Sequence, residues 1–511
     1  MMHYRAGLRT LQRHAAPCAT RRLLAAAAQP PPPQPASRPV HRAPPARQVF
    51  ASLALERPVF PIRQPIRVLR EPQEFYRELL RGISQAQRRI CLSSLYLGTQ
   101  ETELVAALDQ ALARNPALEV HVLLDCLRGT RLDSAGASSA TLLAPLVAAH
   151  GRDRVRVSLY HTPALSGVSK RTWPQRFNEA FGLQHIKAYV FDDSVIVSGA
   201  NLSRDYFTNR QDRYMQLTDR PFADYFVGLV DAVGRVSFEV VADGAGSGGF
   251  RLAMARGVPD PSREPREFVR EANDVVTRFL CRMEAEHPAG DADSLGSQGT
   301  VAIPTVQMRQ LAITQDECHM NEFFAVVDQW AQQRPCRSVM ASAYFNFSEH
   351  YKRALLEGHG RWDLLVASPQ ANGFHAARGI SQFIPDMYSI IERDFVCEAA
   401  RRERGSCISV EEYARTGWTF HGKGIWCYLD QQLPQLTMIG SPNYGYRSIY
   451  RDLEAQVTLI PGSDALKASI HREAQDLLAH SHPVDLPALR KRTRSAPLWL
   501  HGLRPFIQNK M

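Results

Sequence analysis

Apolar and polar positions along the chain alternate between the period of a strand and the period of a helix. The run RRICLSSLYLG (88–98) is apolar and rich in β-formers, TQETELVAALDQALARN (99–115) has apolar residues at helical spacing, and LEVHVLLDCLRG (118–129) is strand-like again. The same order returns in 336–358 and 361–373. This alternation predicts βαβ units and an α/β fold in which each sheet is mostly parallel or mixed and is flanked by helices.

The second series of elements repeats the first at a nearly constant spacing. The segment SLYLGTQETELVAAL aligns with SAYFNFSEHYKRALL at an offset of 248 residues, which places Ser94 on Ser342 and Tyr96 on Tyr344. A near-constant offset predicts two similar halves of one architecture. We place the first half at 66–255, a linker or surface insertion at 256–305, the second half at 306–488 and a basic, apolar tail at 489–511.

Each half contains a His-x-Lys pair at the head of an apolar run, in QHIKAYVFDDSVIVSGANLS from 184 and in FHGKGIWCYLDQQLPQLTMIGSPNYGYRS from 420. Side chains two positions apart on a strand point the same way, so His185 shares a face with Lys187, and His421 with Lys423. Each run ends in a small-residue turn with an asparagine, and an acidic residue stands eleven positions after that asparagine. The residues in question are Asn201 and Asp212 in the first half, and Ser441, Asn443 and Glu454 in the second.

Each of these sets supplies the groups that phosphoryl transfer needs. A histidine can act as nucleophile or as acid and base near neutral pH. Lysine, asparagine and serine side chains can bind phosphate oxygens, and a carboxylate can orient the imidazole through its second nitrogen. We therefore expect one site between the halves, in which Asp212 orients His185 and Glu454 orients His421. The residues alone indicate phosphodiester transfer or hydrolysis through a histidine intermediate.

The first motif resembles that of the phospholipase D superfamily, whose His-x-Lys-x4-Asp pattern is matched by His185, Lys187 and Asp192. The second copy departs from the pattern, because Tyr428 stands at the expected position and Asp430 comes two residues later. The resemblance implies two phospholipase D-like halves packed with one active site at their interface. It also implies catalytic roles for both His-Lys pairs and for Asp192, with His185 as nucleophile and His421 as general acid and later base.

Within the superfamily, GLQHIKAYVFDDSVIVSGANLSRDYFTNRQDRY, GWTFHGKGIWCYLD and IGSPNYGYRSIYRDLEAQ are similar to segments of the mitochondrial CDP-diacylglycerol–glycerol-3-phosphate 3-phosphatidyltransferase family. This resemblance implies CDP-diacylglycerol and glycerol 3-phosphate as substrates, and phosphatidylglycerophosphate and CMP as products, in phosphatidylglycerol and cardiolipin biosynthesis. The chemistry then requires no cofactor, and the effect of a divalent ion stays open. The alternatives are a cardiolipin synthase, a phosphatidylserine synthase, a nuclease of the same superfamily, or a non-enzymatic membrane scaffold.

Charge is distributed unevenly along the chain. Residues 1–55 hold eight arginines and no Asp, Glu or Lys, so that of the formal net charge of +10 only about +2 belongs to the remainder. A nearly neutral body disfavours nucleic acid as a partner. The Arg-rich, acid-free leader and the Pro-rich stretch after it are typical of a mitochondrial transit peptide and a linker, which we place at 1–48. We expect a peripheral protein on the matrix side of the inner membrane, folded from about Val68 onward.

Two basic segments with aromatic residues, 164–182 and 489–507, are candidates for contact with an anionic membrane surface; for both, packing within the fold is the alternative. The turn between the first strand and helix also offers a nucleotide-binding candidate formed by Ser94, Tyr96, Gly98 and Thr99. The nine cysteines are scattered and include no Cys-x-x-Cys pair, so the sequence predicts no metal site.

Overall fold

The computed structural model describes residues 45–166, 181–243, 249–290, 299–375, 377, 379–430, 432–494, 496–497, 499–500 and 502. The chain divides into two units, Met1–Pro44 and Pro45–Met511. The first unit, with nearly all of the expected transit peptide and linker, lies outside the described residues, and so does 167–180 of the expected membrane-contacting segment. Within the described part of the chain, no helix combines the length and the apolar character that a bilayer crossing requires.

The first half is built on a nine-stranded sheet. Its central strands β3, β4 and β5 are parallel, whereas β6, β7 and β9 run antiparallel to their neighbours, so the sheet is mixed. In spatial order the strands are β11 (Phe250–Met254), β10 (Phe238–Ala242), β5 (Val155–Tyr160), β4 (Glu119–Asp125), β3 (Arg89–Ser93), β6 (Ala188–Phe191), β7 (Ser194–Ser198), β9 (Tyr214–Thr218) and β2 (Arg67–Leu69).

The second half repeats this plan in a ten-stranded sheet, where β14, β15 and β16 are parallel and β18 and β19 are antiparallel to their neighbours. The spatial order is β1 (Phe60–Ile62), β12 (Thr300–Met308), β20 (Glu454–Ile460), β19 (Leu436–Gly440), β18 (Gly424–Leu429), β14 (Cys336–Ser342), β15 (Arg361–Ala367), β16 (Ile408–Tyr413) and β21 (Ser481–Pro483), with β13 (Ile313–Thr314) on β12. The expected α/β fold with two similar halves and mixed sheets is confirmed.

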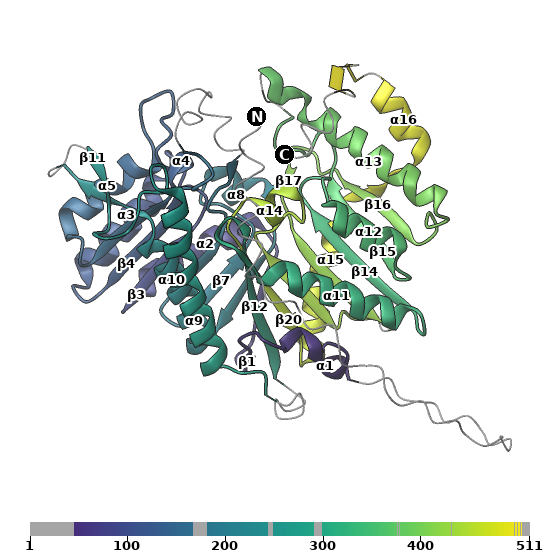
Figure 1. Ribbon diagram of the computed structural model, residues 1–511, viewed down its shortest axis with the longest axis horizontal. Coiled ribbons are helices and arrows are strands. Elements are labelled where there is room, and N and C mark those ends of the chain that lie inside the picture. The colour runs from purple at the N-terminus through teal and green to yellow at the C-terminus, as the bar shows by residue number, and fades with distance from the viewer. Residues whose placement is uncertain are drawn as a thin grey trace. The chain divides into compact units, whose positions relative to one another are not determined.

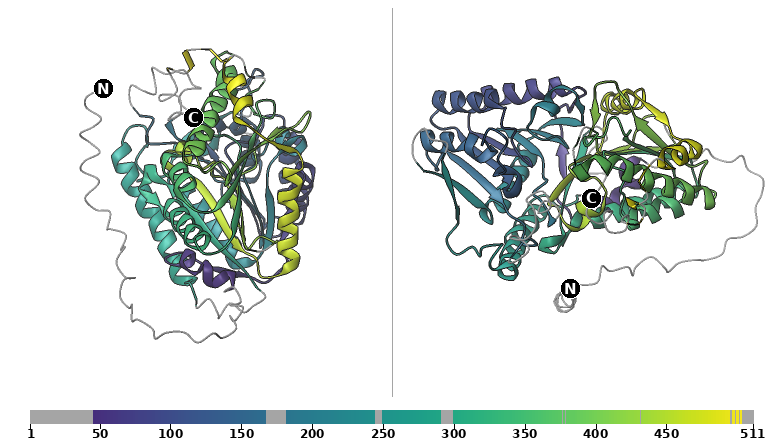
Figure 2. Two further views of the ribbon diagram at one scale, coloured as in Figure 1. Left: turned by 90° about the vertical axis from the view of Figure 1, so that its right-hand side faces the viewer. Right: turned by 90° about the horizontal axis from the view of Figure 1, so that it is seen from above.

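Helices cover the sheets because strand side chains alternate between two apolar faces. In the second half, Met340 and Leu364 face the cluster that packs under the helices, whereas Val339 and Leu365 join a core to which both halves contribute. Figures 1 and 2 show the helices on the outer faces of the strands. The principal helices are α2 (Pro72–Gln85), α3 (Thr102–Arg114), α5 (Ser139–His150), α9 (Arg220–Arg235), α10 (Pro265–Glu286), α11 (Gln315–Ala331), α12 (Glu349–Glu357), α13 (Ile384–Arg401), α15 (Asp464–Leu478) and α16 (Leu486–Arg494).

The folded body starts earlier than the expected Val68. Phe50 and Leu53 are fully buried in the core of the second half, and β1 adds to the edge of β12 in antiparallel register. The short helix α1 (Ala46–Val49) begins directly after Pro45, within the range that we assigned to the leader. The segment before β2 is therefore part of the second half, although it precedes the first half in the sequence.

The range 256–305, which we expected to be a linker or surface insertion, contains the 22-residue helix α10 and the start of β12. Phe268 and Val276 of α10 are fully buried in the core shared by the halves. The Gly/Ser-rich stretch 286–299, of which 291–298 lies outside the described residues, suggested a linker or surface insertion. The sequence analysis missed this amphipathic helix because polar residues occupy its outer face.

The tail segment that we considered for membrane contact is packed against the second half over its helical part. Leu489 and Thr493 of α16 are buried, and Arg492 forms ion pairs with Glu412 at 2.7 Å and Glu392 at 3.2 Å. Trp499 is 43 % exposed and meets the ring of Phe383 edge-on. Residues 503–511 lie outside the described residues.

Candidate active site

The two histidine segments are held by backbone bonds that cross from one half to the other. The amide of His185 donates to the carbonyl of Leu453 at 2.8 Å, and the amide of Leu453 donates to the carbonyl of Leu183 at 2.8 Å. In the same way, the amide of His421 donates to the carbonyl of Gln211 at 2.7 Å. There, β17 (Thr419–Phe420) pairs with β8 (Arg210–Gln211) in parallel. Each histidine is thus tied to the residue that precedes the acid of the opposite half.

This crossing decides which carboxylate holds which imidazole. Nδ1 of His185 lies 2.9 Å from Oε2 of Glu454, and Nδ1 of His421 lies 2.6 Å from Oδ2 of Asp212. Both carboxylates are fully buried side chains. Our pairing of Asp212 with His185 and of Glu454 with His421 is wrong, because each acid serves the histidine of the other half. Both imidazoles keep Nε2 for the reacting group.

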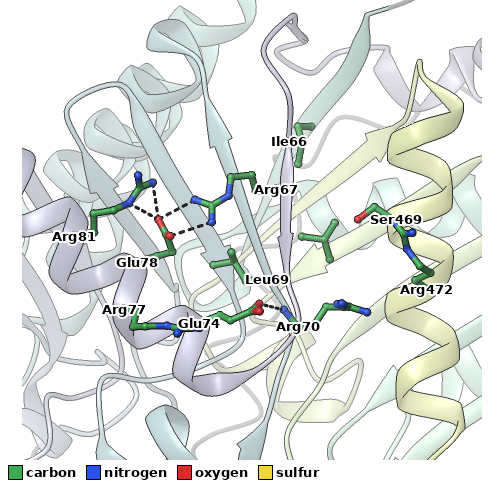
Figure 3. A pocket seen from close by; sticks show the side chains of 11 residues that line it. Ile66, Arg67, Leu69, Arg70, Glu74, Arg77, Glu78, Arg81, Ser469 and Arg472 are labelled. Atoms are coloured by element: carbon green, nitrogen blue, oxygen red, sulfur yellow. Dashed lines mark hydrogen bonds and ion pairs between the residues drawn. The ribbon is translucent and has the colours of Figure 1, made fainter.

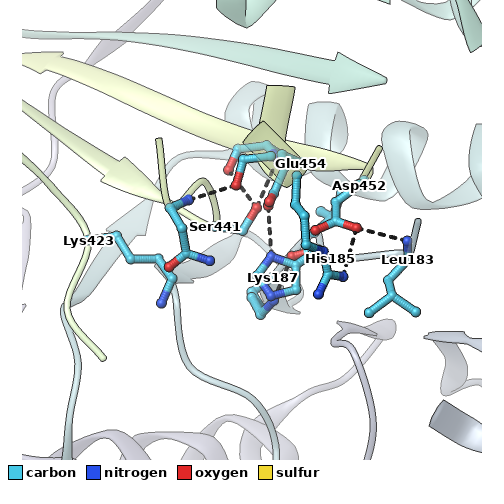
Figure 4. Close-up of polar contacts among 12 residues, drawn as sticks. Leu183, His185, Lys187, Lys423, Ser441, Asp452 and Glu454 are labelled. Carbon is cyan, nitrogen blue, oxygen red and sulfur yellow. Dashed lines mark hydrogen bonds and ion pairs between the residues drawn. The ribbon is translucent and has the colours of Figure 1, made fainter. Parts of the chain in front are cut away.

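The two lysines lie beside the histidines and complete a buried charged cluster. Nζ of Lys187 donates to the carbonyl of His185 at 2.7 Å, and Nζ of Lys423 donates to the carbonyl of His421 at 2.6 Å. Lys423 also approaches Oδ2 of Asp212 at 3.8 Å. Figure 4 shows Lys187 and His185 close together under the carboxylate of Glu454. The structure brings together both His-Lys pairs and both acids, as one shared site requires.

Burial shifts the pKa of every ionisable group in this cluster. Desolvation, followed by the charge of Lys187, holds the pKa of His185 well below its usual range, and desolvation with Lys423 does the same for His421. Desolvation raises the pKa of Asp212 to about 6 and of Glu454 to about 7, against the opposing pull of the lysines. Desolvation also lowers the pKa of Lys423 to about 8. Desolvation also holds the pKa of Lys187 well below its usual range, so a bound anion would favour its ammonium form. Such a cluster suits a site that receives an anionic phosphorus centre.

Asp192 does not belong to this cluster, so our assignment of a catalytic role to it is corrected. Its carboxylate accepts backbone amides of Gln87 at 2.8 Å and Arg88 at 2.8 Å, and it sits in a tight turn with φ of 52°. Asp430 occupies the corresponding turn, with φ of 46° and its amide bonded to Pro335 O. It comes two residues late because β18 has six residues where β6 has four. The missing second-motif acid is therefore a turn residue displaced by a longer strand.

The small-residue turns have a steric reason. A Cβ at Gly199 would lie 2.8 Å from Oδ1 of Asp212 and 2.9 Å from Cδ of Lys423, so a larger residue would push the carboxylate and the lysine apart. The amide oxygens of Asn201 and Asn443 are buried and have no partner among the described residues. An amide oxygen accepts hydrogen bonds, so it suits a hydroxyl group, and the expected binding of phosphate oxygens by these two asparagines stays a prediction. Ser441 instead hydrogen-bonds Glu454 and, through its hydroxyl, the backbone of Ala455, so it supports the carboxylate.

Comparison with known proteins identifies the family of the chain. The family model described as "Cardiolipin synthase, PLD-like domain" matches residues 79–231. The human mitochondrial CDP-diacylglycerol–glycerol-3-phosphate 3-phosphatidyltransferase is 39 % identical, over 87 % of this chain and 82 % of its own length. A probable enzyme of the same name from Dictyostelium discoideum is 38 % identical over 87 % of this chain and 78 % of its own, and that from Schizosaccharomyces pombe is 33 % identical over 87 % and 94 %.

The chain belongs to the CDP-diacylglycerol–glycerol-3-phosphate 3-phosphatidyltransferase family. The crystal structure of phosphatidylserine synthase from Haemophilus influenzae has the same fold, with a TM-score of 0.64 over 91 % of this chain and 99 % of that one, at 17 % identity. The expected family resemblance is confirmed.

For a phosphatidyltransferase of this family, the structure adds site residues that the motifs did not reveal. The hydroxyl of Tyr206 lies 3.3 Å from Nε2 of His421 and accepts from the side-chain amide of Asn201 at 3.0 Å. The guanidinium of Arg210 stacks on the Tyr206 ring at 4.9 Å and is held by the hydroxyl of Thr419 at 3.0 Å. Tyr206 and Arg210 lie between Asn201 and Asp212 in the first half. The sequence does not show that this segment contacts His421 of the second half.

The nucleotide-binding candidates lie near this region but make internal contacts. Ser94 is fully buried and bonds the carbonyl of Tyr96, whose own hydroxyl lies 3.2 Å from Ser203. Thr99 donates to Asp133 at 2.6 Å. Gly98 packs against the carboxylate of Glu101, which caps the backbone of Arg204 at 2.6 Å. A buried carboxylate at the start of α3 opposes a phosphate there, so nucleotide contact at these four positions stays a prediction without further support.

Proposed function

We propose that this protein transfers the phosphatidyl group of CDP-diacylglycerol to glycerol 3-phosphate, releasing CMP. The observation that carries the proposal is the pair of buried imidazoles, each held by the opposite half's carboxylate, in a chain of this phosphatidyltransferase family. Two imidazoles that are held at Nδ1 can present Nε2 to the two sides of one phosphorus, which is what a double displacement needs.

In the first step, Nε2 of His185 attacks the phosphorus of CDP-diacylglycerol that bears the diacylglycerol group. A bond forms between nitrogen and phosphorus while the bond to the CMP oxygen breaks, and His421 supplies a proton to the leaving group. The pKa of His421, which burial lowers, rises when the anionic diphosphate enters beside Lys187 and Lys423, because the added negative charge favours imidazolium. The product of this step is a phosphatidyl-histidine and CMP.

In the second step, His421 takes the proton from a hydroxyl of glycerol 3-phosphate, whose oxygen attacks phosphorus and displaces His185. Glu454 holds the His185 ring in one tautomer and stabilises its positive charge while the intermediate exists. The two steps invert phosphorus twice, so the proposal entails ping-pong kinetics and retention of configuration.

The charge that develops on phosphorus is matched by fixed cations and amides of this chain. Lys187 and Lys423 are both about 1 % exposed, and buried charges act more strongly than solvated ones. Arg210 adds a further cation on the His421 side, where its charge contributes to the low pKa of that histidine. We assign Arg210 to the phosphate of the acceptor. With these groups the chemistry needs no metal ion, whatever a divalent ion does for substrate binding.

We further infer that the protein works in mitochondria, on the matrix side of the inner membrane. The human, hamster and mouse relatives are named mitochondrial, and the leader has the composition of a transit peptide. The lipid substrate requires contact with a membrane, and an anionic surface would suit the basic segments.

The test is to incubate the purified protein with CDP-diacylglycerol labelled in the phosphatidyl group. Without an acceptor, we expect a burst of about one CMP per active site and label on the protein. Adding glycerol 3-phosphate should then chase the label into phosphatidylglycerophosphate, whereas serine or phosphatidylglycerol should not. Sequential kinetics with net inversion would refute the histidine intermediate, and transfer only to serine or phosphatidylglycerol would refute the proposed acceptor.

A further inference from the structure

A second charged hollow lies outside the catalytic cluster, on the surface where the two halves meet. It has a volume of about 660 Å³, within the range of small-ligand pockets. Its walls are β2 and α2 of the first half and α15 of the second (Figure 3). Five arginines and two glutamates line it. The arginines are Arg67, Arg70, Arg77, Arg81 and Arg472, and we call this hollow the arginine groove.

Three of the five guanidiniums already have a carboxylate. Arg67 and Arg81 share Glu78, at 3.0 Å and 2.7 Å, and Arg70 reaches Asp476 on α15 at 2.8 Å. The second glutamate of the lining, Glu74, accepts the backbone amide of Arg70 at 2.8 Å. Glu78 and Asp476 are therefore paired with arginines, whereas Glu74 is held by a backbone amide alone.

Arg77 and Arg472 have no ion pair with any described residue, although they stand on opposite walls of the same hollow. A guanidinium presents a planar set of donors that fits phosphate oxygens, and crowding of cations from three elements raises the local potential for an anion. The arginines are exposed to solvent, and both halves contribute them to the lining of one concave surface.

The walls of the arginine groove connect to the catalytic acid Asp212 from both sides. The side-chain amide of Gln211 donates to the carbonyl of Arg70 at 2.8 Å, and the backbone carbonyl of Gln211 accepts a hydrogen bond from the amide of His421. On the other wall, Glu473 follows Arg472 and holds the guanidinium of Arg213 at 2.8 Å. A ligand that contacts both α2 and α15 would thus stabilise the positions of Gln211 and Arg213, the residues on either side of Asp212.

We propose that the arginine groove binds a phosphate-bearing anion, through Arg77 on one wall and Arg472 on the other. The ligand is a phosphomonoester or diphosphate group, carried either by an acidic phospholipid headgroup or by a soluble molecule. Binding there joins the two halves outside the catalytic cluster. The proposal does not depend on the transferase activity, since none of its residues contacts the histidines.

The test uses the full chain with the double variant Arg77→Gln/Arg472→Gln. Its matched control is Arg266→Gln on α10, which removes an exposed arginine far from the groove in the sequence. One arm measures the affinity for inorganic pyrophosphate by titration calorimetry and the accompanying rise in melting temperature. The other measures sedimentation with phosphatidylcholine vesicles that do or do not contain phosphatidic acid. Circular dichroism and the melting temperature without ligand verify that each variant is folded.

We expect the double variant to bind pyrophosphate at least about tenfold more weakly than the unmodified protein, with the control unchanged. If binding to phosphatidic acid vesicles falls in parallel, the natural source is a lipid headgroup; if only pyrophosphate binding falls, it is a soluble phosphate compound. Equal affinities of all three proteins for both probes would overturn the proposal. Transfer activity in detergent, measured on the same samples, separately tests the proposed function.

Discussion

Exchange of each carboxylate for its amide tests the crossed pairing of acids and histidines directly. In Glu454→Gln, the new amide can point its NH2 toward Nδ1 of His185, which favours the tautomer with the proton on Nε2, the wrong nitrogen for attack. Asp212→Asn should do the same to His421. The carboxyl groups are fully buried and lie 2.9 Å and 2.6 Å from their imidazoles, so water cannot replace the lost contact.

The size of the effect follows from the type of hydrogen bond. A bond to a charged group contributes about 1.5–3 kcal/mol, which corresponds to a loss of roughly 10- to 150-fold in rate at about 1.4 kcal/mol per tenfold. Misplacement of the tautomer adds to this loss, up to about 10⁴-fold in hydrolases with a comparable triad. We therefore expect Glu454→Gln to slow the CMP burst by at least about tenfold.

Nuclear magnetic resonance of protein labelled only in histidine distinguishes the crossed pairing from pairing within a half. Each Nδ1 proton bound to a carboxylate should give a low-field signal, assigned through His185→Ala and His421→Ala. Glu454→Gln should shift the His185 signal and leave that of His421 nearly in place, and Asp212→Asn should do the reverse. If Glu454→Gln moved only the His421 signal, in a variant with an unchanged melting temperature, the reasoning from the crossed backbone bonds would be refuted.

Three further predictions address charge at the site and at the interface. Because the pKa of Lys423 is lowered to about 8, its ammonium group is present below that pH and lost above it, so kcat/KM should fall as pH rises through about 8. In Lys423→Arg the guanidinium stays protonated, so the fall in kcat/KM should shift to higher pH. If the fall stays at the same pH in this variant, another group causes it. Glu473→Ala should lower the free energy of unfolding by about 3–5 kcal/mol in urea denaturation, because it leaves the fully buried Arg213 unpaired, whereas Asp476→Ala, which breaks only an exposed pair, should cost less than about 1 kcal/mol. A chelator should leave the amplitude of the CMP burst intact at saturating CDP-diacylglycerol, and a burst abolished by the chelator and restored by a divalent ion would contradict chemistry without a metal.

The sequence singled out the histidines and lysines through the alternation of faces on a strand. In the structure both pairs lie just before a strand instead, His185 and Lys187 before β6 and His421 and Lys423 before β18. The two pairs still meet in one cluster, because the repeated motif places them at equivalent positions of the two halves. The repeat also predicted two similar halves, since the same order of elements returned at a near-constant offset. The elements at the halves' borders were missed for a physical reason. Phe50 and Leu53 pack in a core to which strands and helices from Val301 onward contribute, and local composition does not reveal a distant partner.

The pairing of acids and histidines could not be read from spacing for a related reason. The distance in sequence from Asn to acid is the same in both halves, which made pairing within each half the simplest expectation. What decides the pairing is the contact of β8 with β17 and of Gln184 with Leu453, and both are contacts between halves. The same limit applies to Asp430, whose position depends on a strand two residues longer than its counterpart.

The crossed arrangement links catalysis to the assembly of the two halves. Asp212 and Glu454 are fully buried, desolvation raises the pKa of each, and each contacts the histidine of the other half. A half by itself would leave its carboxylate without the partner imidazole and its histidine without an orienting acid, so neither would hold a competent set. The backbone hydrogen bonds from His185 to Leu453 and from His421 to Gln211 set the register of one half against the other, and this register brings each acid next to its histidine. A shift of one residue between the halves would therefore abolish both hydrogen-bonded pairs together, which explains why these buried charges lie where the two sheets meet.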